Sequence, residues 1–205
     1  MENTLGLCII TTGGTFDKQY DEIRGELTFR RSHLPRILKA ARCAMPVTVE
    51  RSMAIDSLLM EESHRKKIAN ACTKRPENRI IVTHGTDTMV QTAHVVAERK
   101  LDKVIVFTGA MVPFALEYSD AVFNLGCAVT AVQLLAPGVY ICMNGKVFPF
   151  DQVKKNREIG VFEGFSIQSS QKTNLPRCLP PHPTAELLLN QPTSLPSYQH
   201  GLGAK

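Results

Sequence analysis

The sequence of 205 residues lacks tryptophan and contains only four tyrosines, so aromatic side chains are scarce. Its net charge is only +5, and its short basic clusters are confined to Arg65–Lys67 and Lys154–Arg157. Proteins that bind nucleic acid typically carry a basic stripe interleaved with aromatic residues. This composition therefore argues against a nucleic-acid partner.

Long apolar runs and common cofactor motifs are also missing. No stretch approaches the roughly 18 apolar residues of a membrane span. The first apolar run ends in glycines, which is typical of a strand and not of a signal peptide. Neither phosphate-binding pattern, G-x-x-x-x-G-K-[ST] or G-x-G-x-x-G, occurs. We therefore expect no membrane contact and find little support for nucleotide binding.

The six cysteines never approach C-x-x-C spacing, and most of them lie within apolar strand or helix patterns. A thiol in such a position usually acts as a small buried hydrophobe. We therefore expect reduced thiols in a cytoplasmic protein, without a disulfide or a metal site. A metal bound by His84 and Asp87 is the alternative, although no further ligand has suitable spacing.

Five apolar, β-branched runs alternate with segments of helical periodicity. The expected strands are Leu5–Thr11, Val47–Met53, Arg79–Thr83, Lys103–Thr108 and Gly138–Met143. The expected helices are Ser32–Cys43, with Ser32 as cap, Met60–Cys72, Thr88–Lys100 and Ser119–Leu135. This alternation predicts an α/β fold with an open, mostly parallel sheet that is covered by helices on both faces.

The composition changes after about Phe165. Six of the twelve prolines fall in residues 166–205, among Ser, Thr, Gln and Asn. Such a composition buries too little apolar surface to offset chain ordering. We therefore expect one domain at residues 1–165 and a Pro-rich, disordered tail at residues 166–205.

Two turns rich in hydroxyl groups follow two of the expected strands. The first is Thr11–Thr15, with paired glycines, and the second is Thr83–Thr88, which contains His84 and Asp87. Turns at the carboxyl ends of parallel strands meet where an open α/β sheet binds ligands. A threonine hydroxyl is a poor nucleophile at pH 7 unless a base removes its proton. A lysine from elsewhere could act as that base, and Asp87 could bind a substrate ammonium group.

An ordered series of segments resembles the L-asparaginase family of the bacterial, threonine-nucleophile type. The two turns are similar to its two signatures. Asp56–Met60 resembles its substrate loop, and Gly109–Pro113 resembles its Gly-Ala-Met-Arg-Pro segment, with Val112 in place of the arginine. Further similar segments are Ser119-Asp120, Asn124-Leu125, Met143-Asn144 and Asp151–Lys154.

The resemblance implies specific roles for residues of this chain. Thr15 would be the nucleophile, Tyr20 would lie on a lid formed by Phe16–Phe29, and Thr86, Asp87 and Lys154 would form a proton-relaying set. The implied lysine is Lys154 and not Lys155, because Lys154 comes three residues after Asp151. The implied substrate-binding residues are Ser57, Thr86, Asp87, Gly14 and Ala110, with Ser57 and Asp87 holding the α-carboxylate and α-ammonium groups.

The resemblance also implies the reaction, which is hydrolysis of L-asparagine to L-aspartate and ammonia through an acyl-threonine intermediate. It implies no metal or organic cofactor and a homodimer or other homo-oligomer. Usual members of the family carry a second α/β domain, which the last forty residues cannot form, so a short single-domain member is expected. Two alternatives stay open: a non-catalytic amino-acid-binding or regulatory remnant, and an amidase for glutamine or another small amide.

Overall fold

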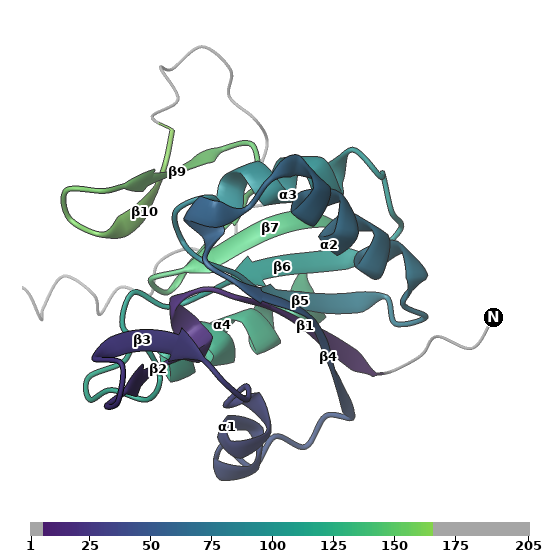
Figure 1. Ribbon diagram of the computed structural model, residues 1–205. Coiled ribbons are helices and arrows are strands. Elements are labelled where there is room, and N and C mark those ends of the chain that lie inside the picture. Colours follow the sequence, from purple (N-terminus) through teal and green to yellow (C-terminus); the bar gives the residue numbers. More distant parts are fainter. Residues whose placement is uncertain (1–5, 166–205) are drawn as a thin grey trace, which may run out of the picture. The chain divides into compact units, whose positions relative to one another are not determined.

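The computed structural model describes residues 6–165, which form a six-stranded sheet in the order β4-β1-β5-β6-β7-β8 (Figure 1). The first five strands in this order are parallel, and β8 pairs antiparallel with β7 at the edge. The strands of this sheet are β1 (Leu7–Gly13), β4 (Val47–Ile55), β5 (Arg79–Thr83), β6 (Val104–Thr108), β7 (Gly138–Met143) and β8 (Lys146–Pro149).

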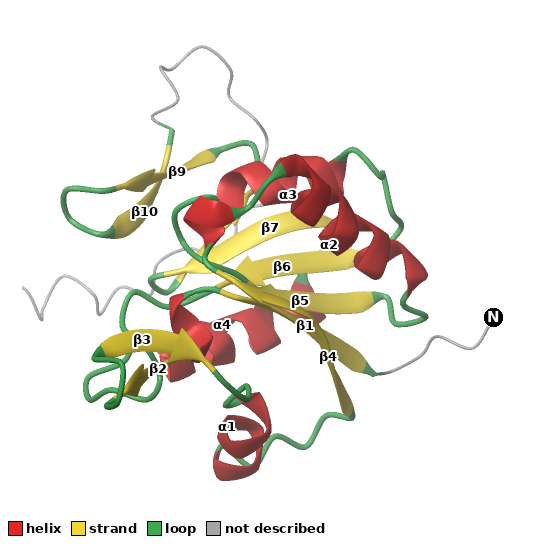
Figure 2. Cartoon of the chain, in the orientation of Figure 1, coloured by secondary structure: helices red, strands yellow, loops and turns green. Residues whose placement is uncertain are grey.

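Helices cover both faces of the sheet (Figure 2). Helices α2 and α3 pack on one face, and α1 and α4 pack on the other. Their bounds are α1 (Leu34–Ala40), α2 (Glu62–Lys74), α3 (Met89–Ala97) and α4 (Ala121–Leu134). The expected α/β fold with an open, mostly parallel sheet is thereby confirmed.

The alternation of side chains along β1 shows how the sheet builds two cores. Cys8 and Ile10 belong to the cluster beneath α2 and α3, whereas Leu7 and Ile9 belong to the cluster beneath α1 and α4. All four side chains are fully buried. A parallel strand that is covered on both faces needs a continuous apolar run, and this explains the uninterrupted apolar residues 7–10 of β1.

The structure contains short elements that the apolar pattern does not reveal. Two antiparallel hairpins flank the main sheet, and two 3-10 turns follow strands β1 and β4. These elements are β2 (Lys18–Asp21) with β3 (Glu26–Phe29), β9 (Val153–Asn156) with β10 (Val161–Gly164), η1 (Thr15–Asp17) and η2 (Ser57–Leu59). Both hairpins and both turns carry residues of the expected site.

Helix α1 begins at Leu34 with His33 as its N-cap, which corrects the expected cap at Ser32. The Ser32 hydroxyl still accepts a hydrogen bond from the Leu34 backbone N–H at 3.3 Å. The expected tail at residues 166–205 lies outside the described residues. No helix within residues 6–165 is long and apolar enough to cross a membrane.

Candidate active site

The two hydroxyl-rich turns meet at the carboxyl ends of β1 and β5. Gly14, with φ at 74°, packs directly on the turn after β5, because a Cβ atom built on Gly14 would lie 2.3 Å from the Gly85 backbone nitrogen. Only glycine fits such an approach without a shift of the backbone. Thr15 and Thr86 each follow a glycine of this contact directly, so the contact joins the two expected hydroxyl residues in one site.

Ser57 lies against the same contact. A Cβ atom built on Gly85 would lie 2.4 Å from Ser57 Oγ. Ser57 is only 1% exposed, and its Oγ has no hydrogen-bond partner among the described residues. A buried hydroxyl without a partner is costly and uncommon in folded proteins. Ser57 Oγ therefore keeps unused hydrogen-bonding capacity at this site.

Side-chain hydrogen bonds to the backbone and one ion pair fix the loop that carries Ser57. The Thr88 hydroxyl donates to the Ser57 carbonyl oxygen at 2.8 Å, and this bond links η2 to the start of α3. The Asp56 carboxylate caps η2 by accepting from the Leu58 N–H at 3.0 Å. Asp56 also pairs with Lys18 Nζ at 2.5 Å, and this ion pair holds the pKa of Asp56 below its usual value. The β2–β3 hairpin is thus tied to the Ser57 loop.

A lysine, a hydroxyl and a carboxylate form a connected set next to these turns. Lys155 Nζ donates to Thr86 Oγ1 at 2.8 Å and to Asp87 Oδ1 at 2.9 Å. The Lys155 side chain is 11% exposed and the Asp87 side chain is 32% exposed, so the ion pair lies at the boundary between protein and solvent. This arrangement connects the Thr86 hydroxyl to a lysine–carboxylate ion pair.

The lysine of this set is Lys155, which corrects the assignment to Lys154. Val153 at the start of β9 is buried, and side chains along a strand alternate between its two faces. Lys155 therefore shares the inward face with Val153, whereas Lys154 is exposed on the other face. Counting three residues from Asp151 selects the wrong neighbour, because a shift of one residue in a strand changes the face.

The turn after β6 completes the floor of the site. A Cβ atom built on Gly109 would lie 2.4 Å from the His84 carbonyl oxygen and 3.4 Å from Thr86 Cγ2. Ala110, expected to bind substrate, is fully buried beside it. Asn124 Nδ2 donates to the Gly109 carbonyl oxygen at 3.1 Å, so the first turn of α4 fixes this floor.

Two asparagines hold the β9–β10 hairpin in place, and the apolar pattern does not reveal this role. Asn124 Oδ1 accepts from the Asn144 N–H at 3.1 Å, and Asn144 Oδ1 accepts from the Phe162 N–H at 3.0 Å. Asn144 has a positive φ of 55°, a conformation that asparagine adopts more readily than most residues. The connection runs from the floor at Gly109 to the hairpin that carries Lys155.

His84 supports the site as a neutral, buried side chain. Its Nδ1 lies 2.8 Å from the Gly85 carbonyl oxygen, and its Nε2 lies 2.9 Å from Thr92 Oγ1. Burial lowers the pKa of His84 to about 4. Both ring nitrogens are occupied, so His84 has no free nitrogen for a metal. Within residues 6–165 no group of three or more His, Cys, Asp or Glu side chains is arranged to hold a metal ion.

Tyr20 lies on strand β2 and is 56% exposed. Within the described part of the chain, its hydroxyl makes no hydrogen bond to Thr15 or to the Lys155 set. The β2–β3 hairpin begins directly after η1, and the expected place of Tyr20 on a lid stays a prediction. Its catalytic role stays a prediction.

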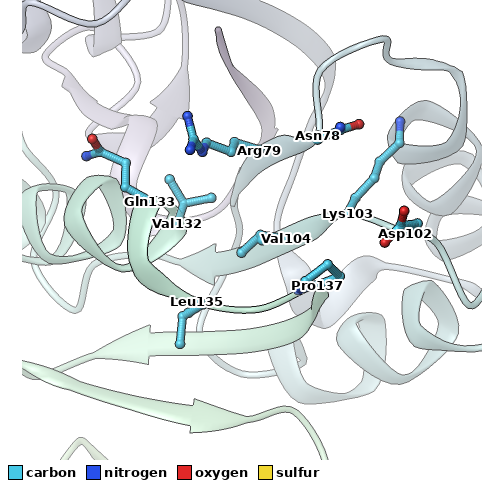
Figure 3. Close-up of a pocket in the computed structure, with 9 residues that line it drawn as sticks. All are labelled: Asn78, Arg79, Asp102, Lys103, Val104, Val132, Gln133, Leu135 and Pro137. Atoms are coloured by element: carbon cyan, nitrogen blue, oxygen red, sulfur yellow. The ribbon is translucent and has the colours of Figure 1, made fainter. Parts of the chain in front are cut away.

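A cavity of about 230 Å³, drawn in Figure 3, lies at the amino ends of the strands, opposite the candidate site. Its lining comes from the amino ends of β5 and β6 and from the end of α4, and includes Arg79, Lys103 and Gln133. Lys103 Nζ is bound to the carbonyl oxygens of Cys72, Thr73 and Arg75, so it closes the end of α2. Its lining includes Asp102 and Lys103 but no hydroxyl side chain, and it is not the candidate active site.

The chain is similar to known proteins along most of its length. A family model described as "Asparaginase, N-terminal" matches residues 6–174. The L-asparaginase 2 of Escherichia coli is 37% identical over 100 residues, which cover 47% of this chain and 28% of that protein. A glutamyl-tRNA(Gln) amidotransferase subunit from Thermococcus kodakarensis is 29% identical over 152 residues, which cover 71% of this chain and 34% of that protein.

A solved structure has a similar overall fold. The thermostable L-asparaginase from Thermococcus kodakarensis aligns with a TM-score of 0.70 and 26% identity, covering 78% of this chain and 51% of that one. The chain thus spans about half of this structure, about a third of the amidotransferase subunit and just over a quarter of the Escherichia coli protein. Because the family model matches most of the sequence and the fold agrees, the chain belongs to the asparaginase family through its N-terminal domain.

Proposed function

We propose that this chain is an amidohydrolase that converts L-asparagine to L-aspartate and ammonia through an acyl-threonine intermediate. The observation that carries the proposal is the contact of Lys155 Nζ with Thr86 Oγ1 and Asp87 Oδ1, next to the Gly14–Gly85 contact. A chain that only binds an amino acid needs no lysine between a hydroxyl and a carboxylate. The assembled set therefore favours catalysis over a non-catalytic remnant.

In the proposed reaction, Thr15 Oγ attacks the carbon of the side-chain amide. The new C–O bond forms as the C–N bond breaks, and the nitrogen leaves as ammonia after it takes up the proton lost by the hydroxyl. Water then attacks the acyl-threonine ester, which releases the carboxylic acid and restores the Thr15 hydroxyl. The Thr86–Lys155–Asp87 set is proposed to relay protons in these steps. The scheme uses no metal or organic cofactor.

The free polar atoms of the site match the charges of an α-amino acid. Asp87 Oδ1 is taken by Lys155, but its Oδ2 has no hydrogen bond to any described residue, and it can accept one from an α-ammonium group. Ser57 Oγ is buried without a partner and can donate to an α-carboxylate. Gly14 shapes the approach to Thr15, and buried Ala110 lies next to Gly109 on the floor. These assignments rest on the geometry of each residue and on the family resemblance.

A second candidate substrate is glutamine or another small amide. The similarity to a glutamyl-tRNA(Gln) amidotransferase subunit extends over more of this chain than the similarity to the Escherichia coli L-asparaginase. One extra methylene in a substrate changes binding by only about 1–3 kcal/mol in an apolar pocket. Both amides are therefore compatible with the same catalytic set.

The test is ammonia release by the purified 205-residue chain from L-asparagine and from L-glutamine, with Thr15→Ala as the control. We expect release from L-asparagine at a higher kcat/KM than from L-glutamine, and a loss of roughly 10³-fold or more in Thr15→Ala. A higher kcat/KM for glutamine would mean that glutamine is the preferred substrate, with the same mechanism. No release from either amide would contradict the proposed function.

The proposed setting of this reaction is a homodimer or other homo-oligomer in the cytoplasm. Five cysteines of the described residues are free thiols, which fits a reducing compartment. Sedimentation analysis of the purified chain measures the oligomeric state directly.

A further inference from the structure

A second cavity, of about 570 Å³, lies away from the Lys155 set and is strongly basic. It is bordered by the β2–β3 hairpin, the segment that leads into α1, and strand β4. Its charged and titratable lining consists of Arg30, Arg31, His33 and Arg51, without any aspartate or glutamate. Three guanidinium groups thus surround one cavity that holds no lining carboxylate.

The positive charge of this cavity is only partly compensated by neighbouring carboxylates. Arg30 Nη2 lies 3.3 Å from Asp21 Oδ2, which pairs one guanidinium at the edge. The side chains of Arg31 and Arg51 make no hydrogen bond or ion pair with any residue in the described range. Two guanidinium groups are therefore available to an anion.

Two carboxylates on or in contact with the segments that carry these arginines are engaged elsewhere. Asp17 accepts hydrogen bonds from the Ser32 hydroxyl and the His33 N–H, so it serves the start of α1. Arg51 also borders a smaller cavity of about 370 Å³, where the only carboxylate is that of Glu50. Glu50 pairs with Arg75 at 3.4 Å. Neither carboxylate neutralises Arg31 or Arg51.

We propose that the 570 Å³ cavity binds a small molecule that carries a phosphate group. A guanidinium group presents donors in a fork that matches the oxygens of phosphate, and several such groups around one cavity favour a multiply charged anion. The volume lies within the range of ordinary ligand pockets and exceeds what a single water or ion needs. This binding is separate from amide hydrolysis and does not depend on the proposed function.

The local concentration of charge favours a small ligand over a nucleic acid. A nucleic-acid surface needs cations that follow the backbone over several phosphates, usually with aromatic residues that stack on bases. Here Arg31 and Arg51 both line one cavity, and Phe29 is its only aromatic lining residue apart from His33. Its ring already lies under Lys18, with Nζ 5.8 Å from the ring centre.

The test is calorimetric titration of the 205-residue chain with pyrophosphate as the probe, in a buffer free of phosphate. The binding variant is Arg31→Ala with Arg51→Ala, which leaves the proposed catalytic residues intact. The matched control is Lys66→Ala with Arg99→Ala, which removes the same two charges from exposed positions on α2 and after α3. Circular dichroism checks that each variant is folded.

We expect pyrophosphate to bind the wild-type chain at one saturable site, and to bind the Arg31/Arg51 variant at least 10-fold more weakly. The control variant should match the wild type. No saturable binding, or equal weakening in both variants, would overturn the proposal. Citrate and single-stranded RNA are two further probes, which distinguish a phosphate site from other anion sites. Citrate binding as tightly as pyrophosphate would indicate a carboxylate site. Single-stranded RNA binding more tightly and depending on Arg31 and Arg51 would indicate a nucleic-acid surface. Either result would also overturn it.

Discussion

Single side chains of the candidate site differ in how firmly the protein holds them. Lys155 is fixed at both Thr86 and Asp87, whereas Ser57 Oγ and Asp87 Oδ2 are left without partners among the described residues. The groups proposed to move protons are therefore pre-assembled, whereas these two oxygens keep unused hydrogen-bonding capacity for a substrate. This division is what a preorganised site requires before its substrate arrives.

The pair of neighbouring lysines provides a matched test of the proton relay. Lys155→Met removes the ammonium group while keeping a chain of similar length, and we expect kcat to fall by about 10²–10⁴-fold, the usual contribution of general acid–base catalysis. Lys154→Met removes the same charge one residue away, on the exposed face of β9, and should stay near wild type. Steady-state kinetics on asparagine measures both. If Lys154→Met is the impaired variant, the relay has been assigned to the wrong lysine.

His84 predicts a pH dependence of stability. Its pKa is lowered from 6.5 to about 4 by burial, so the unfolded chain takes up a proton at a higher pH than the folded chain does. Stability should therefore fall as the pH drops below 6.5, by about 2 kcal/mol down to pH ~5 at 1.36 kcal/mol per unit. The carboxylates with lowered pKa, such as Asp56, lose their contribution only at lower pH.

Urea unfolding measured at several pH values in this window tests the role of His84. His84→Gln should remove most of the slope. His64→Gln should retain it, because glutamine suits the capping position that His64 occupies on α2. A flat profile in the wild-type chain would show that the imidazole is not buried as described.

The sequence predicts the site residues on turns better than those on short strands. Thr15, Ser57, Thr86 and Asp87 directly follow strands with clear apolar runs, so their place at the edge of the sheet is predictable. Lys155 lies on a strand of only four residues, whose single fully buried member is Val153. Unless it is known that Val153 faces inward, the sequence does not indicate which of the two lysines points toward the site.

At the level of elements, the contact between the turns after β1 and β5 determines whether a site exists. Gly14 and Gly25 both have positive φ angles, 74° and 68°, but their surroundings differ. A Cβ atom on Gly14 would collide with Gly85, whereas a Cβ atom on Gly25 would meet nothing within 4 Å. Substitutions at the two glycines therefore distinguish the effect of backbone strain from the effect of losing the Gly14–Gly85 contact.

We expect Gly25→Ala to lower the free energy of unfolding by about 1–2 kcal/mol, the cost of the left-handed conformation alone. Gly14→Ala should lower it by roughly 3 kcal/mol or more, since it adds a collision with backbone atoms. It should also abolish turnover, because the turns must separate. Chemical denaturation and ammonia release measure the two effects. Equal destabilisation by the two substitutions would mean that the Gly14–Gly85 contact is not tight.

Elements with long apolar runs are predictable, and the hairpins are not. Strands β5 and β7 have the bounds expected from the sequence, and α2, α3 and α4 lie within a few residues of theirs. The β2–β3 hairpin is mostly polar and largely exposed, so no alternation distinguishes it from a loop. Its structure depends on cross-strand pairing and on the Lys18–Asp56 ion pair, which joins residues that are distant in the sequence.

At the scale of the whole molecule, the sheet separates two cores and brings three turns to one edge. The strand order β4-β1-β5-β6 places the turns after β1, β5 and β6 side by side, and the Ser57 loop follows β4. This order cannot be derived from one sequence, because parallel crossovers leave several strand orders possible.

The proposed mechanism depends above all on an acyl-threonine intermediate at Thr15, and hydroxylamine trapping tests for it most directly. Hydroxylamine attacks an acyl ester in place of water, so asparagine turnover in its presence should yield aspartyl hydroxamate while ammonia is still released. Thr15→Ala should yield neither product, and Lys154→Met should yield both. Ammonia release without any hydroxamate, or hydroxamate formation by Thr15→Ala at the wild-type rate, would contradict the mechanism.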